Sequence, residues 1–120
     1  MRDFDDISVN LNNHIATITI QRPPNNFFDS FLIQQIADAY VELDEIDDCR
    51  VILLCSEGKN FCAGANFGED KDMHNKSHPY SKLYDQAVRL FRTNKPVVAV
   101  VQGAAVGGGL GLALSADFRI

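Results

Sequence analysis

The sequence lacks the cysteine pattern of a disulfide-bonded or zinc-binding domain. Its three cysteines, Cys49, Cys55 and Cys62, are odd in number and form no C-x-x-C pair, so neither a disulfide framework nor a metal site is expected. Residues 1–6 carry three carboxylates where a signal or transit peptide would need basic residues and an apolar run. Reduced cysteines without an export signal are typical of a cytosolic or organelle-matrix protein, and we expect a cytoplasmic one.

Basic residues are scarce as well. The chain has 11 Lys and Arg against 16 Asp and Glu, which gives a formal net charge of -5, and the basic residues are scattered. Nucleic-acid binding relies on clustered positive charge, so we expect no nucleic-acid partner. The 120 residues are 46% hydrophobic and 22% charged, which is typical of one folded domain with a single core.

One apolar run, 97–114, raises the alternative of a membrane helix. Within it Gly103, Gly107 and Gly111 are spaced four residues apart, as at contacts between membrane helices. Three consecutive glycines, 107–109, would however cost a helix about 1 kcal/mol each relative to alanine. The Val-rich start of the run also favours a strand. We therefore expect no membrane-spanning segment.

The hydrophobic periodicity changes along the chain in a way that indicates an α/β fold. Alternating apolar residues on both sides of Asn12-Asn13 predict a β-hairpin. Asp29 or Ser30 is placed to cap the following helix, and the next strand reads as buried on both faces. The predicted elements are the strands 7–11 and 15–20, the helix 29–46, the strand 51–55, the helix 80–91, the strand 97–101, the helix 110–115 and the strand 117–120. This order predicts parallel strand pairing with helices covering the sheet.

Two of the predicted strands are followed by loops of small side chains. Residues 61–66 (F-C-A-G-A-N) follow the strand 51–55, and residues 103–109 (G-A-A-V-G-G-G) follow the strand 97–101. Open sheets bind ligands at the carboxyl ends of their strands, and Gly and Ala let a ligand approach the backbone. If the two loops converge, one amide from each can stabilise an oxygen that gains negative charge, an effect of about 3–4 kcal/mol per donor.

Four segments of the sequence together resemble the crotonase (enoyl-CoA hydratase/isomerase) family. They are Arg22-Pro23 through Phe28, the loop 61–65, Lys95-Pro96-Val97 and the turn 103–109. They occur in the family's order and at its spacing over nearly the whole chain. The resemblance implies a crotonase-like (ClpP/crotonase) α/β fold of repeated β-β-α units, incomplete at the carboxyl end, with residues 1–120 as the amino-terminal part of one domain.

The resemblance also implies a site and a ligand. In the family, two backbone amides form an oxyanion hole for a thioester, and these correspond here to the amides of Ala65 and Gly108. An acyl-CoA thioester is then the substrate, with no separate cofactor and no metal. The residues expected to bind the substrate or its CoA portion are Asn26, Phe27, Ala63, Gly64 and Gly107.

Two departures from the family pattern bear on the reaction. Gly111 stands where family hydratases carry a glutamate, and the second family carboxylate would lie beyond Ile120. Hydration uses both carboxylates to hold and activate water, so the sequence favours isomerase-type chemistry over hydration. A non-catalytic CoA-binding or structural module is the alternative. For a full-length family member, the resemblance implies a homo-oligomer, a trimer or hexamer.

Nucleotide-binding motifs fit the glycine turn poorly. Counted from Gly107, a G-x-G-x-x-G pattern needs glycine where Leu112 stands. Counted from Gly103, a P-loop needs Lys and then Ser or Thr where Gly109 and Leu110 stand. The glycine turn therefore contains neither motif.

Several other side chains have a structural and a functional interpretation, and we favour the structural one. Cys62 is a buried core thiol or, with His74 or His78, a nucleophile, and His14 is an exposed hairpin residue or a ligand. Three carboxylates of the polar loop are solvated or supply a base: Glu69, Asp70 and Asp72. Five aromatic side chains form core or line an acyl pocket: Phe27, Phe28, Phe31, Tyr84 and Phe91.

Overall fold

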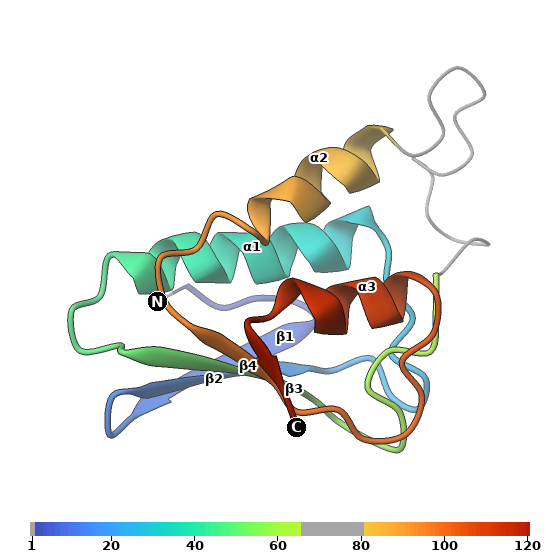
Figure 1. Ribbon diagram of the computed structural model, residues 1–120, viewed down its shortest axis with the longest axis horizontal. Helices are drawn as coiled ribbons and strands as arrows, with labels where there is room; N and C mark the ends of the chain where they lie inside the picture. Colours follow the sequence, from blue (N-terminus) through green and yellow to red (C-terminus); the bar gives the residue numbers. More distant parts are fainter. Residues whose placement is uncertain (1, 66–80) are drawn as a thin grey trace.

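The computed structural model describes residues 2–65 and 81–120 and contains a five-stranded sheet with three helices (Figure 1). The elements are β1 (Ile7–Asn12), β2 (Ile15–Ile20), α1 (Ser30–Asp44), β3 (Val51–Ser56), α2 (Ser81–Arg89), β4 (Val97–Ala99), α3 (Gly108–Ser115) and β5 (Phe118–Arg119). The predicted order of elements is confirmed. One shift in a boundary affects the site directly: α3 begins at Gly108, inside the predicted glycine turn.

The sheet has the strand order β1-β2-β3-β4-β5. The hairpin strands β1 and β2 are antiparallel, and every later neighbour is parallel, as predicted. Asn13 and His14, with φ of 52° and 70°, form the two-residue hairpin turn, since that kind of turn needs positive φ at both positions. His14 is exposed there, as expected of a hairpin residue.

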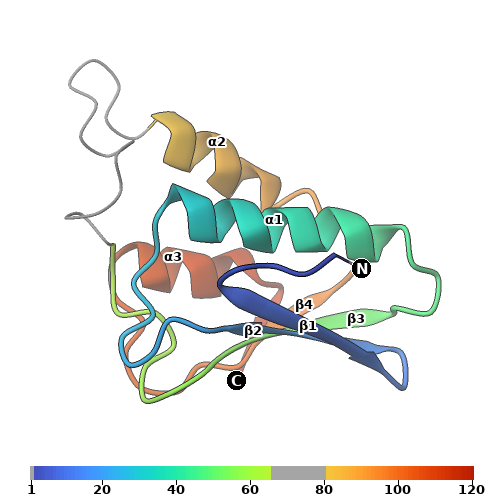
Figure 2. The ribbon, with the colours of Figure 1, turned by 180° about the vertical axis from the view of Figure 1, so that it is seen from behind.

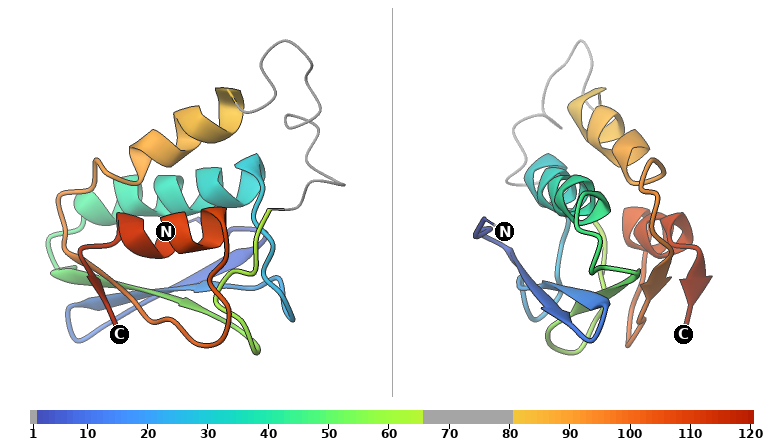
Figure 3. Two further views of the ribbon diagram at one scale, coloured as in Figure 1. Left: turned by 45° about the vertical axis from the view of Figure 1, so that its right-hand side comes forward. Right: turned by 90° about the vertical axis from the view of Figure 1, so that its left-hand side faces the viewer.

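All three helices lie on one face of the sheet (Figures 2 and 3). The core lies between α1 and the strands, where Leu32 and Ile36 of α1 and Ile18, Ile20 and Leu54 of the sheet are fully buried. Asp29 begins α1 by accepting a 2.9 Å hydrogen bond from the amide of Leu32, which confirms the predicted cap.

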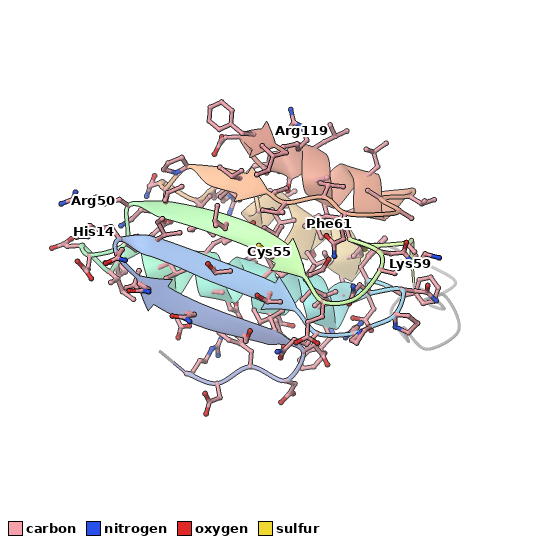
Figure 4. All side chains as sticks on the ribbon, turned by 90° about the horizontal axis from the view of Figure 1, so that it is seen from below. His14, Arg50, Cys55, Lys59, Phe61 and Arg119 are labelled. Carbon is pink, nitrogen blue, oxygen red and sulfur yellow. The ribbon has the colours of Figure 1, made fainter. Side chains whose placement is uncertain are left out.

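The prediction that β3 is buried on both faces is wrong. Ile52 and Leu54 face the helices and are buried, whereas Val51, Leu53 and Cys55 are only half-buried on the opposite face. Figure 4 looks onto this second face, with Cys55 labelled. The reason is that the helices cover a single side, so a continuous apolar run still alternates between a covered and an uncovered face.

The apolar run 97–114 is not a continuous helix. It consists of the short strand β4, a connecting loop and the first part of α3. Within the described ranges, 2–65 and 81–120, no helix is long and apolar enough to cross a membrane.

The chain repeats one structural unit. After β2, β3 and β4 it leaves the main sheet and makes short parallel bridges, Phe28 with Ala65 and Cys62 with Ala105. Each strand-plus-bridge segment is followed by a helix, namely α1, α2 or α3. This is the predicted β-β-α repeat, with the second strand of each unit reduced to isolated bridges.

Candidate functional site

The two small-residue loops run side by side. The amide of Cys62 donates to the carbonyl of Ala104 at 3.1 Å, and the amide of Val106 donates back to the carbonyl of Cys62 at 3.1 Å. The segment before α1 joins them, because the amide of Phe28 donates to the carbonyl of Gly64 at 2.9 Å. The loops after β3 and β4 therefore converge, which is the condition that the sequence analysis set for a shared site, and a third segment lies against them.

The converged loops place five of the predicted site residues on the wall of one pocket. They are Ala63, Gly64, Ala65, Gly107 and Gly108. Gly108 is the first residue of α3, where helix amides have no intrahelical acceptor and carry partial positive charge. No backbone hydrogen bond among the described residues uses the amide of Ala65 or of Gly108. Within residues 2–65 and 81–120, neither donor has a backbone acceptor, and their role as an oxyanion hole stays a prediction.

Two physical reasons favour glycine at this helix start. Gly107 has a φ of 56°, in the left-handed region that other residues rarely adopt. Gly108 and Gly109 have no room for a side chain, since a Cβ on Gly108 would overlap the ring of Phe28 and a Cβ on Gly109 would overlap the carbonyl oxygen of Cys62. This close approach explains why α3 begins within the glycine run.

The pocket has a volume of about 680 Å³ and an apolar wall formed by α1, α2, α3 and the converged loops. Besides the five loop residues, its wall includes Phe28, Ile33, Leu83, Tyr84, Ala87, Leu90, Phe91, Val106, Gly111, Leu112 and Ser115. Among these described residues the only polar side chains are the hydroxyls of Tyr84 and Ser115. A cavity of this kind suits an uncharged, largely apolar group beside free amides.

Fewer of the five candidate aromatic side chains belong to the core than we predicted. We favoured core for most of them, but only Phe28 is buried, with 6% of its surface exposed. Tyr84 and Phe91 are 63% and 70% exposed and line the pocket, because α2 packs against α1 on one side only. Phe27 and Phe31 are also exposed and lie outside this pocket.

Asn26 holds the loop before α1 rather than offering its side chain to a ligand. It is fully buried, and its Nδ2 donates to the carbonyls of Glu57 and Asn60, both at 2.7 Å. Its Oδ1 accepts from the amide of Arg22 at 2.9 Å. All these bonds of the Asn26 side chain are made inside the protein and fix the position of the loop, and the predicted contact of its backbone with CoA stays a prediction.

Sequence reasoning missed the ion-pair network around Arg22. Its guanidinium contacts Asp6 at 2.8 Å and Asp29 at 3.0 Å and donates to the carbonyl of Phe27 at 3.1 Å. Although burial alone would raise it, hydrogen bonds from Arg22 and from Gln35 lower the pKa of Asp6. The Arg22-Pro23 pair was the available sequence signal for this network. Its carboxylate partners, Asp6 and Asp29, lie outside that motif, one before it and one after it in the sequence.

Gly111 also lies on the pocket wall. Its amide donates to the carbonyl of Gly107 at 3.1 Å, so it is within the helix, and a Cβ added to it would meet no atom within 4 Å. A Cβ at position 111 would therefore stand on the pocket wall without a clash. The position where family hydratases carry a glutamate is open here.

The structural interpretation of Cys62 fits the structure. The side chain is buried, and burial is the main cause that raises the pKa of its thiol, which disfavours a reactive thiolate. The other candidate groups, His74, His78, Glu69, Asp70 and Asp72, lie outside the described residues. In the part of the chain that the structure describes, no group of three His, Cys, Asp or Glu side chains is placed to hold a metal ion.

The fold and the site define a class: an α/β protein built from a repeated unit, whose converging strand-end loops of small residues line an apolar pocket. A family model described as Enoyl-CoA hydratase/isomerase matches residues 10–120. The chain therefore belongs to the enoyl-CoA hydratase/isomerase family, and its fold is the crotonase-like fold that the sequence predicted.

Curated relatives agree with this assignment. The chain is 32% identical over 123 residues to the probable enoyl-CoA hydratase EchA14 of Mycobacterium tuberculosis, covering all of this chain and 48% of the relative. It is 34% identical over 111 residues to the peroxisomal fatty acid beta-oxidation multifunctional protein of Oryza sativa subsp. japonica, covering 88% of this chain and 15% of the relative. The chain thus spans about half the length of the first relative and less of the second.

Solved structures show the same fold. An enoyl-CoA hydratase from Shewanella pealeana has a TM-score of 0.83 at 28% identity, with 96% of this chain and 46% of that chain covered. DspI from Pseudomonas aeruginosa has a TM-score of 0.85 at 28% identity, with 99% of this chain and 50% of that chain covered. In both cases nearly all of this chain superposes on about half of a larger protein.

Proposed function

We propose that the protein binds an acyl-CoA thioester and stabilises the negative charge of its enolate through the amides of Ala65 and Gly108. The observation that carries the proposal is the placement of these two amides, both without a backbone acceptor among the described residues, on one apolar pocket. Amides that are held in place before the reaction stabilise a developing oxyanion strongly, since they need no reorganisation.

The acyl group occupies the apolar part of the pocket between α2 and α3, with its carbonyl oxygen at the two amides. The CoA portion leaves along the backbone of Ala63 and Gly64 and past the exposed ring of Phe27. Small residues on both loops support this path, because they let a thioester approach the backbone closely.

Isomerisation of an enoyl thioester is the reaction that this site supports best. A base removes a proton from the α-carbon of a 3-enoyl thioester, the electrons move onto the carbonyl oxygen, and return of the proton at the γ-carbon gives the 2-enoyl thioester. One base suffices for this sequence, whereas hydration also needs a group to hold and deprotonate water. Gly111 has no side chain that could hold or deprotonate water.

A pair of substitutions at Gly108 tests the oxyanion hole. Gly108→Pro removes the amide donor, and proline is tolerated at the first position of a helix. Gly108→Ala keeps the donor and adds the same Cβ against Phe28, so it is the matched control. In the full-length protein we expect the proline variant to turn over a 3-enoyl-CoA about 100-fold more slowly than the alanine variant. Equal rates in the two variants would remove Gly108 from the site.

Ala65→Val tests the second donor in a milder way, since it crowds the approach of the thioester without removing an amide. We expect weaker binding of an acyl-CoA in calorimetry, by about tenfold. Ala87→Val is a pocket substitution of the same size on α2, away from the two amides, and serves as the comparison. Unchanged affinity and turnover in the Ala65 variant would argue against this donor.

A non-catalytic CoA-binding module is the second candidate. Gly111, and the absence of any charged side chain among the described residues of the pocket wall, favour it. Turnover distinguishes the two candidates: if the full-length protein binds acyl-CoA tightly but converts no 2-enoyl or 3-enoyl substrate, the module is correct.

The proposal has three further parts. The cysteine pattern and the amino-terminal residues support a cytoplasmic protein, and the family supports a CoA thioester as substrate without a separate cofactor and assembly as a homotrimer or hexamer. Exposed apolar side chains on α3 and β5, such as Leu114 and Phe118, support assembly, because contact with another chain would remove them from water. Light scattering of the full-length protein tests the oligomeric state.

A further inference from the structure

One residue contacts both loops that supply the proposed oxyanion donors. Phe28 lies in the segment before α1, and it bonds to the first loop through its backbone and packs against the second through its ring. It is the only aromatic residue of the pocket wall that is buried among the described residues. We propose that Phe28 is a positioning residue that sets the relative placement of the Ala65 and Gly108 amides. This inference rests on the proposed function.

The backbone of Phe28 orients the first donor. Its amide donates to the carbonyl of Gly64 at 2.9 Å. That carbonyl and the N–H of Ala65 belong to the same peptide group, which is planar and trans, so the two point in opposite directions. Fixing the carbonyl of Gly64 toward Phe28 therefore turns the N–H of Ala65 away from the segment 26–28.

The ring of Phe28 supports the second donor. A Cβ built on Gly108 would overlap Cζ and Cε1 of the ring, so the ring edge lies directly against the first residue of α3. On the next residue, a Cβ on Gly109 would overlap the carbonyl oxygen of Cys62. The first turn of α3 is thus held between the edge of the Phe28 ring and the first loop. The size of the ring therefore sets how closely Gly108 approaches the segment before α1.

Phe28 is itself held on both sides. The carbonyl of Phe27 accepts a 3.1 Å hydrogen bond from Arg22, and Asp29 both pairs with Arg22 at 3.0 Å and caps α1. The network around Arg22 therefore fixes the residues before and after Phe28. A smaller side chain at position 28 would leave this backbone in place and free only the helix start.

Two substitutions test the role of the ring. Phe28→Leu removes the ring edge against Gly108, and Phe28→Tyr keeps the ring but adds a hydroxyl on Cζ, the atom nearest to Gly108. In the full-length protein we expect each to lower kcat for a 3-enoyl-CoA about 10-fold to 100-fold, since small misplacements of a reacting group have effects of that size. KM should change less than about threefold, because the CoA contacts are intact. Phe31→Leu, on the exposed side of α1, is the control and should change neither.

An infrared measurement separates positioning from stability. Butanoyl-CoA labelled with ¹³C at its thioester carbonyl does not react, and its carbonyl band moves to lower frequency when the oxygen accepts hydrogen bonds. We expect a clear shift on binding to the natural protein and to Phe31→Leu, and a smaller shift in both Phe28 variants. The band is read from bound ligand only, so loss of folded protein lowers its intensity and leaves its position unchanged.

The outcomes distinguish the two proposals. If the natural protein binds butanoyl-CoA without any shift of the carbonyl band, the oxyanion hole itself is wrong. If the natural protein shifts the band and both Phe28 variants shift it equally with unchanged kcat, the oxyanion hole stands and the role of Phe28 is overturned. If the leucine variant does not fold, the tyrosine variant decides in the same way.

Discussion

The helices α1 and α3 begin in opposite ways. At the start of α1, Asp29 accepts a hydrogen bond from the amide of Leu32, and the helix then buries nine residues against the sheet and its neighbours. At the start of α3, Gly107 makes no side-chain cap, and the helix buries only three residues. The start of α1 is capped by a side chain, whereas at the start of α3 the amide of Gly108 has no backbone acceptor among the described residues, although that of Gly109 donates to the carbonyl of Val106. The difference separates the stabilising part of the molecule from its site.

The largest expected effect concerns what α3 lacks. Because Gly111 provides no carboxylate, we expect the full-length protein to hydrate a short 2-enoyl-CoA about two to four orders of magnitude more slowly than ordinary family hydratases. Gly111→Glu should recover part of that activity, since the position opens into the pocket without a clash. Loss of enoyl-thioester absorbance in water measures both proteins. A natural protein as fast as ordinary hydratases would show that another carboxylate holds the water.

The second-largest expected effect concerns the close packing at the start of α3. Gly109→Ala places a Cβ on the carbonyl oxygen of Cys62, and backbone cannot move aside cheaply, so we expect a loss of about 3 kcal/mol in the free energy of unfolding. Gly111→Ala is the matched control in the same helix and should stabilise by up to about 1 kcal/mol, because it meets open space. Urea unfolding compares the two. A Gly109 variant as stable as the Gly111 variant would contradict the packing described here.

The cap of α1 gives a smaller effect. Asp29→Ala removes both the hydrogen bond to Leu32 and the ion pair with Arg22, and we expect a loss of about 1–2 kcal/mol in the free energy of unfolding. Asp29→Asn keeps a capping oxygen but loses the charge, so thermal unfolding of the two variants separates the cap from the ion pair. If both lose the same stability, the cap contributes little and the comparison with α3 weakens.

The smallest effect is a dependence on pH. The pKa of Asp6 is lowered in the folded protein by Arg22 and Gln35, so the folded state binds this proton less readily than the unfolded state. The resulting stability is present above the unfolded value of about 3.9 and is lost as pH falls through the lower folded value. Asp6→Asn should flatten the fall in Tm below about pH 4, whereas Asp3→Asn controls for the change in charge. An unchanged slope in the Asp6 variant would exclude this carboxylate.

Much of the fold could be predicted because its signals are local. Alternation in the hairpin, the helical period after Asp29 and the small residues of the two loops each specify structure within a few positions. The convergence of the loops was left as a condition, and the structure meets it because the parallel strands end at one edge of the sheet. The repeat of strand, bridge and helix came from the family resemblance and was confirmed by the structure.

The wrong predictions concern the burial of side chains. Burial depends on whether a second element covers the outer face of a strand or helix, and the sequence of that strand or helix does not contain this information. The run 51–55 is apolar throughout, yet only its inward face is covered. Tyr84 and Phe91 have helical spacing but face the pocket, because α2 packs on one side. Arg22 pairs with one carboxylate before it in the sequence, Asp6, and one after it, Asp29. The residues next to Arg22 do not indicate either partner.

The donors of the proposed site are peptide groups, and this limits what acidity can do to it. A backbone N–H keeps its proton at any pH at which the protein is folded, and the described wall of the pocket carries no carboxylate, imidazole or amine. Within the proposed function, the oxyanion hole therefore works equally well in acid and in mild alkali. A pH profile of turnover would then report the ionisation of the unidentified base, and a single bend in that profile would give its pKa directly.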